Sequence, residues 1–386
     1  MEILFISHKY PPVIGGMEKQ SFELITGMKK HGRVHAIIFD AEKESRLQFF
    51  LHLEEKIIAM CIKHPMLTII HYNDALVAAV CLRHKRYKHL KRTMTVHGLD
   101  VVFPNWIYRN WIFRKFNAFS LIFAVSNATA KACIDRGISK DKVVVVHNGV
   151  DHTMRGLISK VQMETLLSSQ YGIGTRNRRV LVAMGRPVIR KGFSWFITNI
   201  VPELEPDIVL LLIGPDQRPS QVKRKFWSAI PKGMRKPLEL FMGMPSDADQ
   251  INNLLKKSEI ADIVKQLGTI PYEDIVKILC AADAFIMPNI AVKGDMEGFG
   301  LVCLEAALCG APVYAAAIDG ITDVIHHQKN GLLLPSGDAK SWIKEINNIG
   351  KDTADKMLRD EVIDYTRSRF GWIKMVEEYR AYFLAI

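Results

Sequence analysis

The sequence lacks the features that would place it in a membrane or outside the cell. No run of about 18 uninterrupted apolar residues occurs in the 386 residues, so we expect no membrane-spanning helix. Residues 1–7 have neither a basic leader nor a small-residue cleavage site, and they predict a buried strand rather than a signal peptide. The six cysteines form no Cys-x-x-Cys pair, which argues against a structural zinc site and fits a reducing compartment. We therefore expect a cytoplasmic protein.

The fingerprint of dinucleotide-binding proteins is also missing. Gly-x-Gly-x-x-Gly occurs nowhere in the chain. A nicotinamide-dependent oxidoreductase on a Rossmann-type sheet would need that fingerprint and an acidic residue about 20 positions further on. Such an enzyme stays an alternative function, but its main signature is absent.

Positive charge, in contrast, is abundant. The net charge of +12 indicates an anionic partner, such as a nucleic acid, an anionic lipid or a phosphorylated substrate. Acid-free basic stretches lie at 83–92 and 223–236, although solvated surfaces explain such stretches equally well. A non-enzymatic nucleic-acid binder is thus another alternative. Residues 106–116 carry the aromatic and basic residues it needs, but their spacing near 3.6 also fits a half-buried helix, and we expect no nucleic-acid partner.

Short apolar runs alternate with longer amphipathic stretches along the chain. Strands rich in Val, Ile and Leu between helices are typical of parallel sheets covered on both faces. Four consecutive valines at 143–146 predict a buried parallel strand. Strands are predicted at 2–7, 34–39, 67–71, 93–96, 121–125, 143–147, 179–184, 207–213, 284–287, 312–315 and 332–334, and helices at 17–30, 126–136, 272–282, 300–309 and 372–386.

This alternation starts twice, as expected for a chain longer than one ordinary domain of about 100–200 residues. We predict the α/β class, with two facing, doubly wound, Rossmann-like domains and a cleft between them. The predicted domains are 1–160 and 161–365, and 366–386 is expected to form a helix that packs back on the body. Sheets of this kind bind ligands at the carboxyl ends of their strands.

Two loops that follow predicted strands contain residues suited to phosphate. Gly15 and Gly16 come between the first strand and a helix, where backbone N–H groups and the helix dipole favour an anion. Arg186 and Lys191 follow the strand 179–184 and could hold a diphosphate between two cations. An ordinary strand–helix turn and a basic surface loop are the competing interpretations.

A third loop carries two acidic residues around a Gly-Phe-Gly turn. Glu297 precedes a predicted helix and could serve only as a partner of the helix dipole. Glu305 lies inside that helix among apolar residues, where an unpaired carboxylate would be costly, so we expect it to accept hydrogen bonds from ribose hydroxyls. Asp247 and Asp249 have the spacing of a metal-binding Asp-x-Asp, but their polar surroundings indicate a helix start.

In combination these motifs resemble the family 4 (group 1) retaining glycosyltransferases, which have the GT-B fold. The resemblance covers essentially the whole chain in the right order. It rests on the early Gly-Gly turn, Thr95-Val96-His97-Gly98, His147-Asn148-Gly149-Val150-Asp151, Arg186 followed five residues later by Lys191-Gly192, Leu267-Gly268-Thr269-Ile270-Pro271, the Glu297–Glu305 motif and Lys329-Asn330-Gly331-Leu332-Leu333. The residues His152-Thr153-Met154-Arg155 depart from the family, which often has an aromatic residue there.

The resemblance implies a role for each matching residue. His97 and Glu297 would lie near the reacting carbon of the donor sugar, and Glu305 would hold the ribose. Arg186 and Lys191 would neutralise the leaving diphosphate in place of a metal, so no cofactor and no metal are expected. The remaining donor-binding residues implied are Gly15, Gly16, Thr269, Ile270, Gly298, Phe299, Gly300 and Leu301.

The resemblance also implies the reaction. A hexosyl-type sugar would move with retention of configuration from a nucleoside-diphosphate sugar, with UDP preferred and GDP the alternative. The acceptor would be a glycan or a lipid-linked molecule in the synthesis of cell-envelope polysaccharide or glycolipid. The basic stretch 83–92 adds the expectation of peripheral attachment to the anionic inner face of the cytoplasmic membrane.

Overall fold

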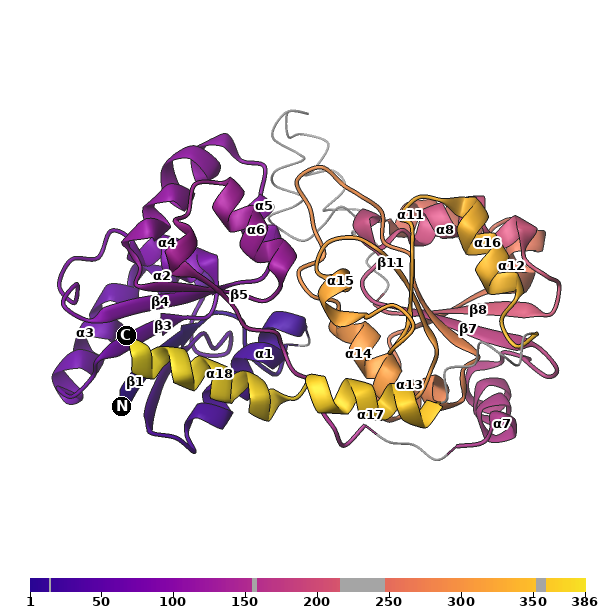
Figure 1. The fold of residues 1–386 in the computed structure, drawn as a ribbon, viewed down its shortest axis with the longest axis horizontal. Coiled ribbons are helices and arrows are strands. Elements are labelled where there is room, and N and C mark those ends of the chain that lie inside the picture. The colour runs from indigo at the N-terminus through magenta and orange to yellow at the C-terminus, as the bar shows by residue number, and fades with distance from the viewer. Residues whose placement is uncertain (14, 155–157, 216–246, 352–358) are drawn as a thin grey trace. The chain divides into compact units, whose positions relative to one another are not determined.

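The computed structural model describes residues 1–13, 15–154, 158–215, 247–351 and 359–386 (Figure 1). The chain forms two compact units, one of Met1–Val150 with Phe370–Ile386 and the other of Asp151–Arg369. The basic stretch predicted at 223–236 lies outside the described residues.

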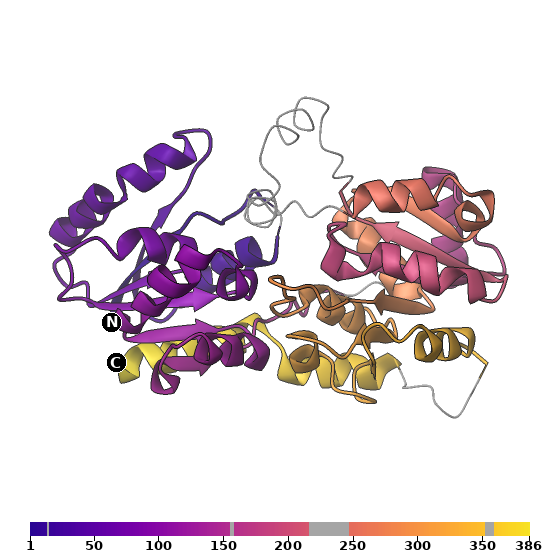
Figure 2. The same cartoon turned by 90° about the horizontal axis from the view of Figure 1, so that it is seen from above.

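The first unit is built on a six-stranded parallel sheet in the order β2-β1-β3-β4-β5-β6. Its register pairs Glu2 of β1 with Arg33 of β2, and Ile3 with Ile69 of β3. Helices cover both faces, as Figure 2 shows from above. The strands are β1 (Glu2–Ser7), β2 (Arg33–Ile38), β3 (Ile69–Tyr72), β4 (Lys91–Val96), β5 (Leu121–Ala124) and β6 (Val143–Val145); the α-helices are α1 (Gly16–Met28), α2 (Arg46–Leu51), α3 (Leu53–Lys63), α4 (Ala75–Cys81), α5 (Leu99–Val102), α6 (Asn127–Asp135) and α18 (Trp372–Ala385).

The second unit repeats this architecture with the strand order β12-β11-β10-β7-β8-β9, again all parallel. Its strands are β7 (Arg179–Met184), β8 (Ile208–Ile213), β9 (Val264–Gly268), β10 (Ala284–Met287), β11 (Val313–Ala316) and β12 (Leu332–Leu334). Its α-helices in the described part are α7 (Lys160–Tyr171), α8 (Phe193–Asn199), α11 (Ala248–Leu254), α12 (Ser258–Ile263), α13 (Tyr272–Ala281), α14 (Leu301–Leu308), α15 (Ile321–Val324), α16 (Ala339–Asn347) and α17 (Arg359–Arg369).

The structure confirms the predicted α/β class, and every predicted strand is present within a few residues. One strand, β9, was not predicted. The valines at 143–146 do form a parallel strand, but β6 is an edge strand and only half-buried, so the expectation of full burial was wrong. The helix predicted at Asp247 is also present as α11. The Asp247 carboxylate accepts the Ser194 N–H at 2.9 Å at the start of α8.

Alternating residues of each strand in the first unit face two separate cores. Leu4 and Ile6 belong to the core on one face, whereas Ile3 and Phe5 face α1 and α18 on the other. Helix α18 comes from the far end of the sequence and closes this second core. Figure 1 shows it along the sheet beside α1. The close approach of these helices depends on Gly27, where a Cβ would lie 2.5 Å from Val376.

A chain of buried polar groups joins α18 to the sheet. His71 lies between the hydroxyls of Thr93 and Thr95 at 2.9 and 3.1 Å, and Thr95 shares a 2.8 Å hydrogen bond with the Tyr379 hydroxyl. The ring of Tyr379 stacks on Phe123 with 4.3 Å between centroids. Complete burial lowers the pKa of His71 from 6.5 to about 3, so the folded protein keeps this ring neutral.

All six cysteines are free thiols. Within the residues that the structure describes, no helix combines the length and the apolar character needed to cross a bilayer.

The buried His71 predicts a loss of stability in mild acid. The unfolded chain binds a proton at this ring below about pH 6.5 and the folded protein does not, so the free energy of unfolding falls as the pH drops from 6.5 towards 3. The expected loss between roughly pH 7 and pH 5 is about 2 kcal/mol. Urea unfolding at the two pH values measures it. This part of the pH dependence should disappear in His71→Gln. The control variant His89→Gln, at an exposed histidine, should keep it. Equal pH dependence in the wild type and both variants would contradict the assignment.

Candidate functional site

Each sheet has one topological switch point, where strands that follow one another along the chain stop adding to one side of the sheet and begin adding to the other. In the second unit the strands run from β7 to β9 on one side and from β10 to β12 on the other, so the switch point lies between β7 and β10. In the first unit it lies between β1 and β3. Loops that leave the carboxyl ends of such strands diverge and leave a crevice where ligands bind. Most of the residues implied by the sequence lie on these loops.

The loops after β7 and β10 are held tightly against each other. The Ile290 N–H donates to the Arg190 carbonyl at 3.0 Å. Gly192 has a φ of +68°, and a Cβ at this position would lie 2.0 Å from the Pro288 carbonyl oxygen. Only glycine allows both this backbone conformation and this approach. Lys191, which precedes Gly192, is thereby directed to the end of β10.

At the centre of these loops one carboxylate is held by cations. Glu297 Oε2 lies 2.9 Å from Lys191 Nζ and 3.4 Å from Arg190 Nε, and it accepts a hydrogen bond from Asn289 Nδ2 at 3.3 Å. Arg190 also contacts the buried Asp295 at 3.2 Å. The side chains of Lys191 and Glu297 are only 9% and 12% exposed. Among the predicted residues the structure thus brings Lys191 and Glu297 into contact, and it adds Arg190, which was not predicted.

The protonation state of Glu297 follows from these partners. Burial acts to raise the pKa of this carboxyl, but the charges of Lys191 and Arg190 outweigh burial and lower the pKa to about 2. Glu297 therefore remains ionised at neutral pH and has no proton to donate. The ammonium of Lys191 also lies 3.7 Å from Met287 Sδ at the end of β10.

The turn before α14 presents backbone groups at the same place. Gly300 is the N-cap of α14 with a φ of +88°, a conformation that favours glycine, and Leu301 begins the helix. The first N–H groups of a helix have no partner within the helix and favour an anion. Behind the turn, Asp319 accepts the Glu297 N–H at 3.1 Å, and the Glu297 carbonyl accepts the Gly320 N–H at 3.0 Å.

The remaining predicted residues of this unit are more open. Arg186 and Thr269 are exposed, and Ile270 and Phe299 are buried. Glu305 lies one turn inside α14 and is half-buried, so it is less enclosed than its apolar neighbours in the sequence suggested. Burial raises the pKa of Tyr272 at the start of α13, and the charge of Glu305 adds to this shift.

The switch point of the first unit holds histidines and aspartates instead. His8, after β1, lies 2.8 Å from the carboxylate of Asp74, after β3. Asp74 also accepts the N–H groups of Leu76 and Val77 at 2.9 Å and so caps α4. Burial acts to raise the pKa of Asp74, but His8 and the backbone donors lower it on balance. Neither His8 nor Asp74 was predicted as a site residue.

His97 follows the neighbouring strand β4 and is oriented by backbone contacts. Its Nε2 lies 2.8 Å from the Asn73 carbonyl, and its own N–H donates to Asp100 at 2.9 Å. A carbonyl only accepts, so Nε2 carries the proton and a neutral ring keeps Nδ1 as an acceptor. The side-chain amide of Asn73 is buried and has no hydrogen-bond partner within the described part of the chain.

The glycine turn of the first unit is shaped by an acidic residue. Gly16 begins α1, and a Cβ on Gly15 would lie 2.2 Å from Glu18 Oε2. Glu18 is buried and pairs with Lys9 at 3.5 Å. The first turn of α1 thus carries a buried carboxylate, and its negative charge opposes the binding of an anion there.

A separate hollow of about 630 Å³ lies at the other end of the second sheet. It is lined by residues that precede β7, β8 and β9, such as Arg178 and Pro206, and contains none of the predicted site residues. The polar loops at the carboxyl ends are therefore the better candidate for the site.

Comparison with known proteins identifies the family of the chain. Residues 173–369 match the family model described as glycosyl transferases group 1, and residues 14–153 match that of glycosyltransferase family 4. An amylovoran biosynthesis glycosyltransferase of Erwinia amylovora is 34% identical over 107 residues, which are 28% of this chain and 26% of that protein. A D-inositol 3-phosphate glycosyltransferase of Saccharomonospora viridis is 24% identical over 244 residues, 62% of this chain and 52% of that protein. The chain thus spans about a quarter to a half of the length of these curated relatives.

Solved structures show the same fold at low sequence identity. Anabaena Alr3699/HepE in complex with UDP-glucose has a TM-score of 0.74 and 20% identity, and sucrose-phosphate synthase of Thermosynechococcus elongatus has 0.73 and 21%. In both cases the match covers 100% of each chain. The two parallel sheets are therefore those of the GT-B fold, and the chain belongs to the group 1 glycosyl transferases.

Proposed function

We propose that the chain transfers a hexosyl group from UDP-sugar to a glycan or lipid-linked acceptor, with retention of configuration and without a metal ion. The observation that carries this proposal is the buried Lys191–Glu297–Arg190 cluster at the switch point between β7 and β10. Two cations beside the start of α14 suit a diphosphate that departs with negative charge. GDP is the alternative nucleotide.

The donor would be held by groups of different kinds. The ammonium of Lys191 has three N–H donors, of which Glu297 and Met287 Sδ occupy two, so one can still donate to a phosphate oxygen. The exposed Arg186 would contact the diphosphate from the mouth of the crevice, and the first N–H groups of α14 would complete its coordination. These groups supply the charge for which other enzymes use a metal.

The sugar and the ribose would meet the acidic residues. Glu297 is ionised, so it would accept hydrogen bonds from sugar hydroxyls and favour positive charge at the reacting carbon. Glu305 would accept from the ribose hydroxyls. In the first unit, Nδ1 of His97 would accept a hydrogen bond from a hydroxyl group of the sugar. His97 would then be a binding group rather than a source of protons.

Similar proteins support UDP as the nucleotide and a role in the synthesis of cell-envelope polysaccharide. Anabaena Alr3699/HepE has been solved with UDP and with UDP-glucose. Relatives carry the names amylovoran and colanic acid biosynthesis glycosyltransferase, which supports a role in polysaccharide synthesis. The membership of the group 1 family weighs against an oxidoreductase or a nucleic-acid binder.

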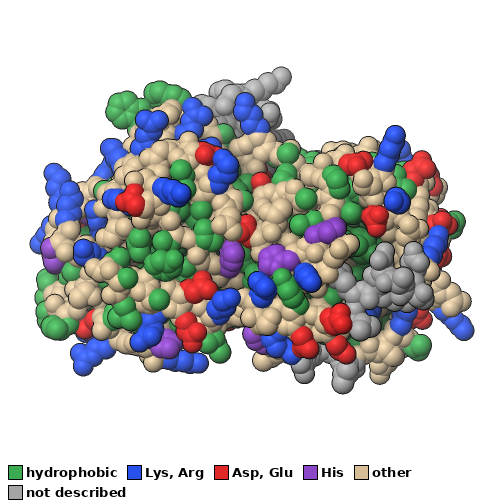
Figure 3. All heavy atoms as spheres, in the orientation of Figure 1, with side chains coloured by type: hydrophobic (Ala, Val, Ile, Leu, Met, Phe, Trp, Pro, Cys, Tyr) green, Lys and Arg blue, Asp and Glu red, His purple; other side chains and the backbone are tan. Residues whose placement is uncertain are grey.

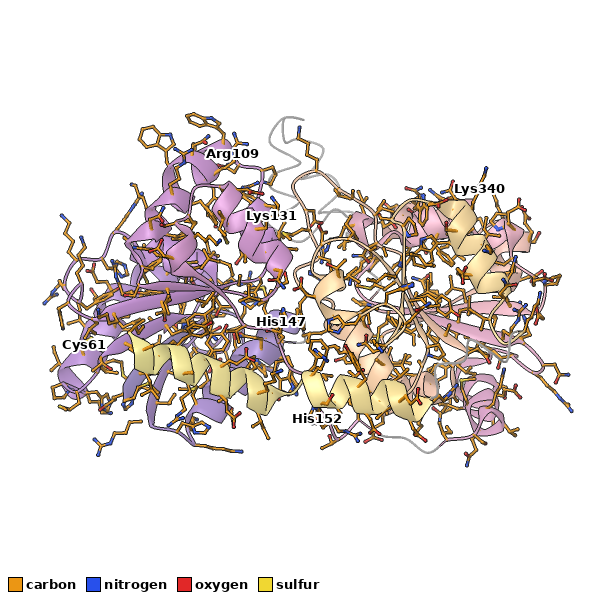
Figure 4. The ribbon with its side chains drawn as sticks, viewed as in Figure 1. Cys61, Arg109, Lys131, His147, His152 and Lys340 are labelled. Atoms are coloured by element: carbon orange, nitrogen blue, oxygen red, sulfur yellow. The ribbon has the colours of Figure 1, made fainter. Side chains whose placement is uncertain are left out.

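The surface of the first unit supports attachment to an anionic membrane. Trp106, Ile107 and Trp111 are 62%, 58% and 61% exposed, whereas the nearby Phe113 is buried. Figure 3 shows hydrophobic side chains projecting beside basic ones at the upper left, and Figure 4 labels Arg109 on this segment. In the basic stretch 83–92, only Arg92 among the Lys and Arg residues is buried. Exposed indoles and cations suit the interface of an anionic leaflet.

The first prediction from the proposed function concerns the donor and the metal. UDP should raise the melting temperature more than GDP does, and transfer from a UDP-sugar should continue in excess EDTA, because protein cations supply the charge at the diphosphate. Thermal shift with UDP, GDP, NAD and an oligonucleotide measures binding, and UDP release measures transfer. Activity that is lost in EDTA and restored by magnesium or manganese would refute the metal-free mechanism; a shift with NAD alone or the oligonucleotide alone would favour the alternative functions.

The second prediction separates binding from turnover. Glu305→Ala should weaken UDP binding by roughly ten- to a hundredfold, since a hydrogen bond to a charged group contributes about 1.5–3 kcal/mol. Lys191→Ala should lower kcat by a similar factor with a smaller effect on Kd, because the charge of Lys191 matters most as the diphosphate departs. The matched control is Lys340→Ala, an exposed lysine on α16. Wild-type kcat in a folded Lys191→Ala variant at saturating donor would show the assignment to be wrong.

The third prediction concerns the membrane. The protein should sediment with anionic but not neutral vesicles, and high salt should release it because the Debye length shrinks from about 10 Å at 0.1 M to about 3 Å at 1 M. Serine at Arg83, Lys85, Arg86 and Lys88 should weaken binding, and so should Trp106→Ser with Trp111→Ser. Absence of binding to anionic vesicles at low salt would leave a soluble acceptor as the better explanation of the charge.

A further inference from the structure

A second group of ligand-type side chains lies far from the candidate donor site. Glu2 begins β1, His35 is on β2, and His64 directly follows α3. The carboxylate oxygen and the ring nitrogens of these residues all lie within 4.8 Å of one another. Figure 1 shows β1 and the end of α3 at the same edge of the first unit.

The individual distances are close to those of a shared metal ion. Glu2 Oε1 lies 2.8 Å from His35 Nε2 and 3.7 Å from His64 Nδ1. Ligand atoms about 2.1 Å from a tetrahedral ion are roughly 3.4 Å apart, so one ion would need the Glu2–His35 pair to open by about 0.6 Å and the Glu2–His64 pair to close by about 0.3 Å. The His35 and His64 ligand atoms already lie within 4.8 Å of each other. The two imidazole rings are stacked, with 3.7 Å between centroids and 26° between planes, and both approach the same carboxylate oxygen, so one ring would turn for both nitrogens to face a single ion.

The backbone holds this arrangement in place. The Glu2 carbonyl accepts the Thr68 N–H at 3.1 Å, and β1 pairs with strands on both sides. The His64 N–H donates to Met60 at 2.9 Å, and its carbonyl accepts the Leu67 N–H at 3.1 Å. Ligands on well-fixed segments lose little freedom when an ion binds.

Burial and access also fit an ion. The Glu2 side chain is 8% exposed, while those of His35 and His64 are 19% and 23% exposed, which leaves a solvent side for entry and for a water ligand. Arg33 and Lys63 are close in sequence but exposed, so water and salt screen their charges.

We propose that Glu2, His35 and His64 bind a divalent transition-metal ion of the zinc class. Two imidazoles and one carboxylate are a common protein ligand set for Zn²⁺, and Co²⁺ and Ni²⁺ accept the same donors. The ion would tie β1, β2 and the end of α3 together. The site lies at the amino ends of the strands, and β1 separates it from His8 by about 17–20 Å at roughly 3.3 Å per residue, so the ion takes no part in transfer.

Direct metal binding tests the proposal. Full-length protein without a histidine tag is stripped with EDTA and titrated with Co²⁺ and Zn²⁺. We expect one equivalent of Co²⁺ to give visible d–d absorption that Zn²⁺ bleaches, and Zn²⁺ to raise the melting temperature by about 5–10 °C at a hundredfold excess over Kd. Mg²⁺, which prefers oxygen ligands, should give neither effect.

Variants identify the ligands. His64→Gln and His35→Gln should each weaken Zn²⁺ binding more than about a hundredfold, since losing only an outer-shell partner costs 10–100-fold. His31→Gln is the matched control, because His31 is an exposed histidine in the same unit. Circular dichroism and melting in EDTA confirm that each variant is folded, and His64, as the more exposed ligand, is the safer of the two changes.

The outcomes are distinct from those of the donor experiments. Transfer that continues in EDTA while the melting temperature falls and zinc is released supports both proposals. Zn²⁺ affinity that is unchanged in folded His64→Gln and His35→Gln, or the absence of a stoichiometric Co²⁺ spectrum, overturns the metal site and leaves the proposed transferase function untouched.

Discussion

The pairing of Glu297 with Lys191 inside the second unit is the constraint on which its site depends. Both side chains are about nine-tenths buried, and each would be costly to bury alone. Their contact requires that β7 and β10 be neighbours, that the loops after them run side by side, and that Gly192 pass close to the Pro288 carbonyl. The same pairing keeps Glu297 ionised and directs an ammonium group towards the start of α14. The Lys191–Glu297 pair thus depends both on the order of the strands and on Gly192.

The two units use the same topological position for different chemistry. At the switch point of the second unit, cations surround a carboxylate, which suits phosphate. At that of the first unit, His8 and His97 lie beside Asp74 and Asp100, which suits hydroxyl groups rather than anions. The buried Asn73 amide, with no partner among the described residues, adds hydrogen-bonding capacity there. These contrasting side chains support the proposal that the second unit binds the diphosphate and that His97 of the first unit binds a sugar hydroxyl.

The sequence predicted the framework better than the contacts. Continuous apolar runs such as 179–184 and 284–287 matched β7 and β10, because a strand buried on both faces contains few polar residues. The edge strand β9, with Lys265 and Gln266 in its centre, gave no such signal. The position of Glu297 and Lys191 on loops after strands was readable from the order of motifs. The sequence did not show which cation contacts Glu297, because Arg190 and Lys191 are adjacent in sequence. It did not show the His8–Asp74 contact either, because that contact depends on the order of strands in the sheet.

The return of the chain to the first unit through α18 also has a consequence during protein synthesis. The ribosome releases residues 1–150 long before Phe370–Ile386, yet Tyr379 and Phe383 complete the core on one face of the first sheet. Until those residues emerge, Phe5, His71 and Phe123 lack their cover, while the second unit can already fold. Helix α1 alone would cover this face until the C-terminal helix arrives, so part of an apolar sheet face would stay exposed on the nascent chain for most of translation.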